Sequence, residues 1–156
     1  MIQSLKALLA DWKETRNITL LFLKELRDAD LDKPLPRKNL NTIRLQMYEL
    51  TLFERDIVNS LGTDLLEYEK EYKYVNLPTS EIILRMNELD IQFEQTLKSL
   101  KGTEMMNYYG QLQNVHQIIS MMIGHEQMHI GQIIAFCYAT EIEIPKSITE
   151  IMALEG

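Results

Sequence analysis

Two histidines four residues apart are the residues of this sequence best suited to chemistry. His125 and His129 stand in the stretch GHEQMHIGQII, residues 124–134. On an α-helix such a pair lies on one face about one turn apart, so both imidazoles can reach one metal ion. Apolar residues continue the same face before and after the pair: Ile118, Met122, Ile133 and Phe136. The pair is therefore expected to face a core, where a histidine needs a hydrogen bond or a metal.

The letters HEQMH also fit the H-E-x-x-H helix of zinc peptidases, in which Glu126 would be the general base. The extended form of that motif needs a glycine and a further histidine where Gln132 and Ala135 stand. The nearest downstream carboxylate for a related motif, Glu150, belongs to a short tail. The sequence argues against a peptidase, and Glu126, about 100° around the helix from His125, is expected to support the site or lie at the surface.

Four further residues carry weaker signals. His116 lies nine residues before His125, which places it on nearly the opposite face and predicts a surface or helix-start position. Cys137 is the only cysteine and is predicted to be a small core residue rather than a nucleophile. Gly124 and Gly131 each weaken a helix by roughly 1 kcal/mol relative to alanine, so they predict close approach of another helix or of bulky metal-site residues.

Helical spacing of apolar residues predicts four helices that would position the histidines. Breaks in the pattern divide them: prolines at 34 and 36, Gly62, a tyrosine-rich connection over 63–78, and the segment TEMMNYYGQLQ over 103–113. Asn114 and Gln117 have the spacing of a capping box at the start of the last long helix. The predicted helices span about 5–26, 41–61, 80–102 and 114–139.

No stretch shows a convincing strand pattern, and Pro145 precedes a short C-terminal tail. We therefore predict an all-α protein, an antiparallel four-helix bundle with a short C-terminal tail, forming a single domain over residues 1–156.

Composition narrows the partners. The 156 residues carry a net charge of −7, which argues against a nucleic-acid surface. No apolar run approaches the roughly 20 residues of a membrane span, and early charges such as Asp11 and Glu14 argue against a secretory signal. These features predict a cytoplasmic protein without a nucleic-acid or membrane partner.

With these residues in view, the sequence resembles the DinB-like, or YfiT-like, superfamily of four-helix metal-binding proteins. The resemblance covers most of the chain. It is most specific where HEQMHIGQI resembles the family pattern H-x-x-x-H-R-G-Q-[LI]: His125, His129, Gly131 and Gln132 match, and Ile130 replaces the frequent arginine. The resemblance implies a divalent metal with open positions at one end of the bundle.

The family usually supplies a third histidine from its second helix. The stretch TIRLQMYELTLFE, residues 42–54, resembles that helix in Thr42, Ile43, Arg44 and Glu54, but Glu49 stands at the histidine position. The resemblance therefore implies a metal held by Glu49, His125 and His129, a set compatible with Zn, Ni, Mn or Fe(II).

Two alternatives to this ligand set stay open. Helical periodicity favours Glu54 over Glu49, because Glu54 lies nearer the centre of an apolar stripe. That stripe comprises Ile43, Met47, Leu50, Ile57 and Leu61. A site formed by the two histidines alone, weak or empty, is the other alternative.

The resemblance implies two functions. The first is an S-transferase that joins a low-molecular-weight thiol such as bacillithiol or mycothiol to a small-molecule substrate, with Gln132 orienting the ligand or supporting the site through hydrogen bonds. The second is a metal-dependent hydrolase. Because Glu49 stands in place of a histidine, a non-catalytic helical module with a degenerate metal site is a further alternative.

Two surface features complete these expectations. The tyrosines of the two connections either line a pocket mouth or pack as ordinary loop residues: Tyr68, Tyr72, Tyr74, Tyr108 and Tyr109. A homodimer is also expected, since the family commonly pairs through bundle faces and Leu45 and Leu52 face away from Met47 and Leu50.

Overall fold

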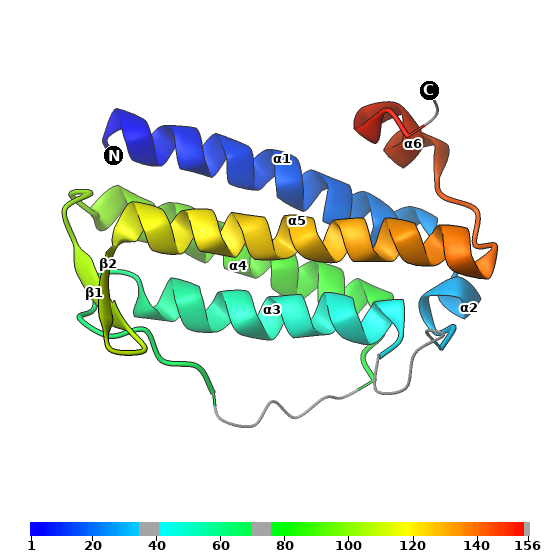
Figure 1. Cartoon of the computed structure of the whole chain (residues 1–156), viewed down its shortest axis with the longest axis horizontal. Helices are drawn as coiled ribbons and strands as arrows, with labels where there is room; N and C mark the ends of the chain where they lie inside the picture. Colours follow the sequence, from blue (N-terminus) through cyan, green and yellow to red (C-terminus); the bar gives the residue numbers. More distant parts are fainter. Residues whose placement is uncertain (35–40, 70–75, 155–156) are drawn as a thin grey trace.

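The structure is a computed structural model that describes residues 1–34, 41–69 and 76–154. Four long helices dominate it (Figure 1). They are α1 (Gln3–Glu25), α3 (Ile43–Ser60), α4 (Thr79–Ser99) and α5 (Val115–Thr140). The short helices α2 (Asp28–Leu31) and α6 (Lys146–Met152) and a hairpin of β1 (Met105–Tyr108) and β2 (Gln111–Asn114) complete it.

The long helices form a bundle in which neighbours run both ways. Ser4 bonds His116 and Thr15 bonds Gln127, and this constant offset shows that α1 and α5 run parallel. Trp12 packs on Phe93 while Arg16 contacts Asp90, so α1 and α4 run antiparallel. Arg44 bonds Thr79 at the starts of α3 and α4, and Asn59 bonds Gln92 near their ends, so α3 and α4 run parallel (Figure 1).

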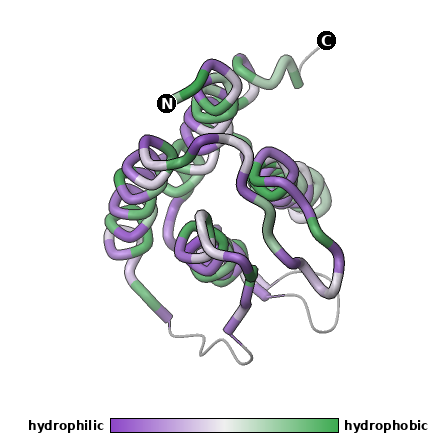
Figure 2. Tube along the Cα trace, turned by 90° about the vertical axis from the view of Figure 1, so that its left-hand side faces the viewer, coloured by the Kyte–Doolittle hydropathy of each residue, from purple (hydrophilic) through white to green (hydrophobic). Residues whose placement is uncertain are grey.

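The predicted four-helix bundle is confirmed. Its helices are not all antiparallel to their neighbours, because α1 runs parallel to α5 and α3 runs parallel to α4. Seen along its length in Figure 2, the long helices surround a shared interior, and hydrophilic and hydrophobic residues alternate along each of them. This alternation is what a helix with one buried face requires. The apolar residues whose helical spacing predicts the helices over 5–26 and 80–102 are all buried: Leu5, Leu9, Trp12, Leu23, Leu26, Ile82, Met86, Leu89, Phe93, Leu97 and Leu100.

The predicted helix ends have physical causes in the structure. Asn114 accepts a hydrogen bond from the backbone N–H of Gln117 at 3.0 Å, and the Gln117 side chain accepts one from the Asn114 N–H at 2.9 Å, which confirms the capping box. Gly62 has φ +84, the left-handed value that follows many helix ends. At the other end of α3, the guanidinium of Arg44 bonds Asp28, Asp32 and Thr79, which ties α2 and the starts of α3 and α4 together.

The expectation that no strand occurs was wrong for residues 105–114. β1 and β2 pair antiparallel around a two-residue turn, Tyr109–Gly110, in which both residues have positive φ. Such turns match the twist of a hairpin, and Asn-Gly or Gly-Gly usually signals them. Tyr109 stands where asparagine or glycine usually signals the turn, so the sequence did not indicate a hairpin. Leu65 adds an isolated parallel bridge to Asn107, which fixes the segment after α3 against the hairpin.

One argument for a dimer also fails. Leu52 is 6% exposed and belongs to the core of this chain, and Leu45 is half-buried, so these residues do not form an open apolar face. The homodimer itself stays a prediction. Among the described residues, no helix has the length and apolar character needed to cross a membrane.

Candidate metal centre

The histidine pair lies midway along α5, on the side that faces α3. The rings of His125 and His129 have centroids 4.7 Å apart at an interplanar angle of 69°. Two imidazoles that share one ion at a metal–nitrogen distance of about 2.1 Å have ring centres roughly 4.5–5.5 Å apart. The spacing predicted from the sequence therefore brings both rings to a separation that a single ion can bridge.

Burial leaves this pair with unmet hydrogen bonds. The Nδ1 atoms of His125 and His129 are buried and have no hydrogen-bond partner among the described residues. Burial, together with the charge of the neighbouring His129, lowers the pKa of His125 to about 4, and burial lowers the pKa of His129. Both rings are thus neutral at pH 7, the form whose nitrogen lone pair binds a metal.

One ring contact shows which side of α3 faces the histidines. Phe53 lies against His125 with centroids 4.0 Å apart. Because α3 and α5 run antiparallel, one turn back along α3 places Glu49 level with His129. Gln46 shares that side of α3 and its buried Oε1 also has no partner among the described residues. Sequence reasoning missed Gln46, which reads as one more polar residue of a helix surface.

The third ligand stays a prediction. Among the described residues, no group of three or more His, Cys, Asp and Glu is gathered closely enough to hold a metal ion. Glu49 is half-buried on α3. Its rival Glu54 is fully buried, as the helical periodicity predicted, but it bonds Arg16 rather than the histidines.

Arg16 joins all four long helices through one guanidinium. Its Nη2 bonds Glu54 of α3 at 2.5 Å, its Nη1 bonds Glu126 of α5 at 3.0 Å, and its Nε bonds Asp90 of α4 at 3.1 Å. The guanidinium also lies over the ring of Trp12, 4.4 Å from the centroid. These bonds compensate for the burial of a side chain that is only 2% exposed.

Glu126 corrects one expectation directly. It is completely buried, accepts hydrogen bonds from Arg16 and from the Thr19 hydroxyl, and is not a surface acid. Burial raises the pKa values of Glu54 and Glu126. The sequence carried a signal for this network: Arg16, Glu54 and Glu126 each occupy a core position of an apolar stripe, and their charges are of opposite sign.

The two glycines of α5 also differ from expectation. Gly124 and Gly131 are exposed, and a Cβ at either position would meet no atom within 4 Å. Close approach of a helix or a ligand residue of this chain is therefore not their cause. Gln132 is exposed one turn beyond His129, where its amide can reach a ligand bound at the pair.

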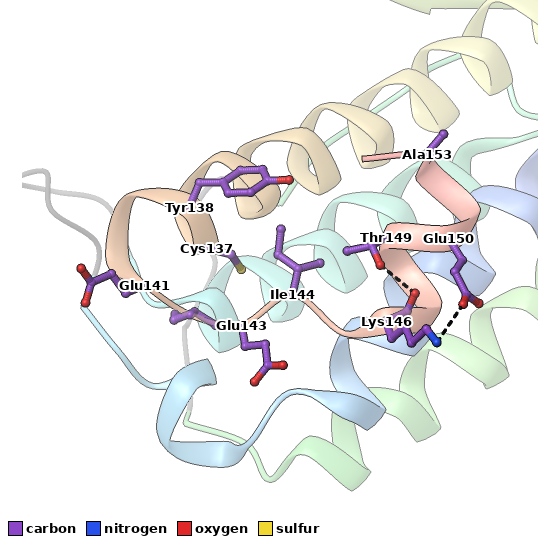
Figure 3. Close-up of a pocket in the computed structure, with 10 residues that line it drawn as sticks. Cys137, Tyr138, Glu141, Glu143, Ile144, Lys146, Thr149, Glu150 and Ala153 are labelled. Atoms are coloured by element: carbon purple, nitrogen blue, oxygen red, sulfur yellow. Dashed lines mark hydrogen bonds and ion pairs between the residues drawn. The ribbon is translucent and has the colours of Figure 1, made fainter. Parts of the chain in front are cut away.

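A cavity among the described residues lies away from the histidines. It has a volume of about 900 Å³ between the end of α5 and α6 (Figure 3). Cys137 contributes to its lining, but the thiol is buried and burial raises its pKa to about 11. A protonated thiol is a poor nucleophile, so Cys137 is the core residue that was predicted. The Lys146–Glu150 ion pair closes one wall.

Two remaining predictions concern the other end of α5. His116 stands in the first turn and its Nε2 lies 2.8 Å from the Ser4 hydroxyl, which confirms a helix-start position. Tyr68 and Tyr108 are half-buried and contact each other, while Tyr109 is exposed. Tyr72 and Tyr74 lie outside the described residues.

A bundle of four long helices with an H-x-x-x-H pair facing its interior defines a class of helical proteins suited to hold a divalent ion. The sequence matches the model of the DinB family over residues 1–137. The chain therefore belongs to the DinB family, which confirms the resemblance seen in its motifs. A search of curated proteins gives no match.

Proposed function

We propose that this protein is a metal-dependent enzyme that transfers a low-molecular-weight thiol, of the bacillithiol or mycothiol type, to an electrophilic small molecule. His125 and His129 would hold a divalent ion, with Glu49 as the third ligand. The observation that carries the proposal is a pair of neutral imidazoles, buried at His129 and half-buried at His125, whose Nδ1 atoms are buried and have no partner among the described residues. Unmet polar atoms in a core cost free energy, and metal binding at the imidazoles would offset that cost.

The chain's own residues would divide the work. The neutral imidazoles offer lone pairs, Glu49 offers a negative charge level with His129, and the exposed Gln132 amide can orient a bound ligand. A divalent ion held there would supply Lewis acidity, which favours the thiolate form of a thiol. In the transfer, the sulfur bonds the electrophilic carbon, the leaving group takes its bonding pair, and the thiol proton passes to solvent. The ring of Phe53 shields one side of His125 from water.

The test is metal content measured beside thiol consumption. Purified protein should contain close to one divalent ion per chain, and His125→Ala and His129→Ala should lose it. His116→Ala is the matched control, because this third histidine of the described chain bonds Ser4 at the start of the same helix. The wild type should consume the thiol in the presence of an epoxide or alkyl halide. Failure to do so with every low-molecular-weight thiol tried would overturn the transferase.

The third ligand needs its own pair of variants. Glu49→Ala should reduce metal content, while Glu54→Gln, which keeps a hydrogen-bond acceptor for Arg16, should retain it. The reverse result would make Glu54 the ligand.

A second function rests on a separate observation, that no three-ligand group is gathered among the described residues. A non-catalytic helical module with a degenerate site would contain no stoichiometric metal. Its melting temperature would not change when zinc or nickel is added, whereas a working site would raise it through binding to the folded state.

A further inference from the structure

The outer side of α5 carries no charge, although the chain as a whole is acidic. From Val115 to Thr140 the only aspartate, glutamate, lysine or arginine is Glu126, and Glu126 is buried. The exposed residues of this helix are all uncharged: Gln117, Ser120, Gly124, Gln127, Met128, Gly131, Gln132, Ala135, Tyr138 and Ala139. Soluble surfaces resist association when roughly 25–35% of their residues are charged. This side of α5 lacks that protection.

A groove of about 400 Å³ lies between α5 and α1, which run side by side (Figure 1). Three apolar residues line it, Leu8 and Ile18 of α1 and Ile123 of α5. Gly124 stands on the α5 rim, where a Cβ would meet no atom within 4 Å. A glycine lets another backbone approach closely, and none of the described residues does so here. The groove thus offers apolar surface and open helix backbone to an outside molecule.

The α1 rim of the groove is acidic. Asp11 and Glu14 are exposed, lie one turn apart and line the groove. Neither carboxylate has an ion-pair partner among the described residues. Lys13, which lies between them in the sequence, pairs instead with Glu94 of α4 at 2.8 Å. A molecule that fills the groove therefore meets two uncompensated negative charges on one edge and an uncharged helix on the other.

These charges favour a helix of another protein over a second copy of this chain. A second copy would bring a further net charge of −7, and its uncharged α5 side holds no cation for Asp11 and Glu14. A helix with lysine or arginine along one edge supplies those cations. Amphipathic helices commonly lay their apolar face into a groove, and complementary charges fix their register.

We propose that the groove between α1 and α5 docks an amphipathic helix of a partner protein. The apolar face of that helix covers Leu8 and Ile18 and packs closely on Gly124, and its basic edge pairs with Asp11 and Glu14. Cations one turn apart on the partner match the two carboxylates, which have the same spacing on α1. The surface is separate from the histidine pair and does not depend on a metal there.

A model peptide tests the proposal on the full chain. It repeats one heptad three times, with leucine and alanine on one face and lysine along one edge, and its twin has glutamate in place of every lysine. Fluorescence anisotropy of the labelled peptides should show saturable binding of the basic peptide and none of the acidic twin. Binding of both peptides, or of neither, would overturn the proposal.

A substitution on the α5 rim separates docking in the groove from general attraction between opposite charges. Gly124→Gln suits a helix but projects into the path of the partner, so it should abolish saturable binding without lowering the melting temperature. Asn87→Gln, on the exposed side of α4, is the matched control. Binding that survives in Gly124→Gln, or that is lost equally in Asn87→Gln, would contradict a docking site here.

The acidic rim has its own pair of variants. Asp11→Asn combined with Glu14→Gln should weaken binding about two- to thirtyfold, the range of two exposed ion pairs, and reduce its dependence on salt. Glu88→Gln combined with Glu141→Gln makes the same change in net charge at other exposed acids and should not. Equal weakening by the two pairs would mean that binding follows net charge alone, against the proposal.

Sedimentation of the free chain tests the other occupant. A dimer that Gly124→Gln dissociates would give the groove to a second copy and exclude the proposed partner, whereas an oligomeric state unchanged in Gly124→Gln supports it. His129→Ala should bind the basic peptide as the wild type does, so a failure of the metal centre and a failure of the groove give different results.

Discussion

His125 and Glu126 are neighbours on α5, yet they enter opposite chemical surroundings. Glu126 turns towards α1, where Arg16 and Thr19 donate to it and the charges of four helices meet. His125 turns towards α3, where Phe53 covers its ring and its Nδ1 has no partner among the described residues. Both sides are polar. Only Glu126 receives hydrogen bonds and a counter-charge from the chain, although Glu54 and Glu126 each keep one buried oxygen without a partner among the described residues. This difference is why we propose a structural role for Glu126 and a ligand at His125.

The largest expected effect on stability comes from removing Arg16, the counter-charge of Glu54 and Glu126. Arg16→Met leaves Glu54 and Glu126 buried without a counter-charge, and it should lower the free energy of unfolding by about 3–5 kcal/mol in urea denaturation. Adding Glu54→Gln and Glu126→Gln to the same chain should restore most of that loss. A loss below about 1 kcal/mol for Arg16→Met alone would mean that the network is not the centre of the fold.

The contribution of His125 to stability should instead depend on pH. The folded pKa of His125 is lowered to about 4, so between pH 6.5 and 4 the unfolded chain binds more protons than the folded one. Stability should therefore be complete above pH 6.5 and fall as the pH drops towards 4. The contribution is on the order of 1–3 kcal/mol in metal-free protein.

The difference between wild type and His125→Asn isolates this contribution from that of the carboxylates. An equal pH dependence in wild type and His125→Asn would show that the ring is solvated.

Replacing a buried group that lacks a hydrogen-bond partner should raise stability, whereas replacing Arg16 should lower it. With a chelator present, His129→Leu keeps a similar volume and removes a buried nitrogen that lacks a partner, so it should raise stability by about 1–2 kcal/mol. Thermal unfolding with and without zinc provides the measurement. A loss of stability under chelator would assign His129 a structural partner.

The exposed side of α5 gives the smallest effect and completes the comparison. Gly131→Ala places a methyl group in open space, so it should raise the free energy of unfolding by at most about 1 kcal/mol. Sedimentation of the same variant checks the predicted homodimer. A shift in oligomeric state would show that this side contacts another copy, whereas an unchanged state and a more stable chain would leave it a free surface.

Much of the fold could be predicted because its helices obey simple rules. The apolar periodicity of α1 and α4, the capping box at Asn114 and the stop at Gly62 are local, and local patterns survive folding. The hairpin was missed because a strained tyrosine occupies its turn. The directions of the helices depend on a long connection whose path no local pattern encodes.

The candidate site was predicted in part for the same reason. The spacing of His125 and His129 is a local property of one helix, so the closeness of their rings could be predicted from the sequence alone. Glu126 was misjudged because its partner Arg16 is 110 residues away in the sequence. A helical wheel shows which residues face inward but not which of them contact one another. The choice between Glu49 and Glu54 depends on which of the two lies beside the histidines.

The separation of Arg16 from Glu126 in the sequence also affects how the protein folds during its synthesis. At the usual 5–20 residues per second, a ribosome needs roughly 5–20 s after making Arg16 to make its partner on α5. Until then α1 has no α5 to lie against, and Arg16 can pair only with Glu54 and Asp90 once each of these has been made. The bundle is therefore expected to close late, as its last long helix leaves the exit tunnel.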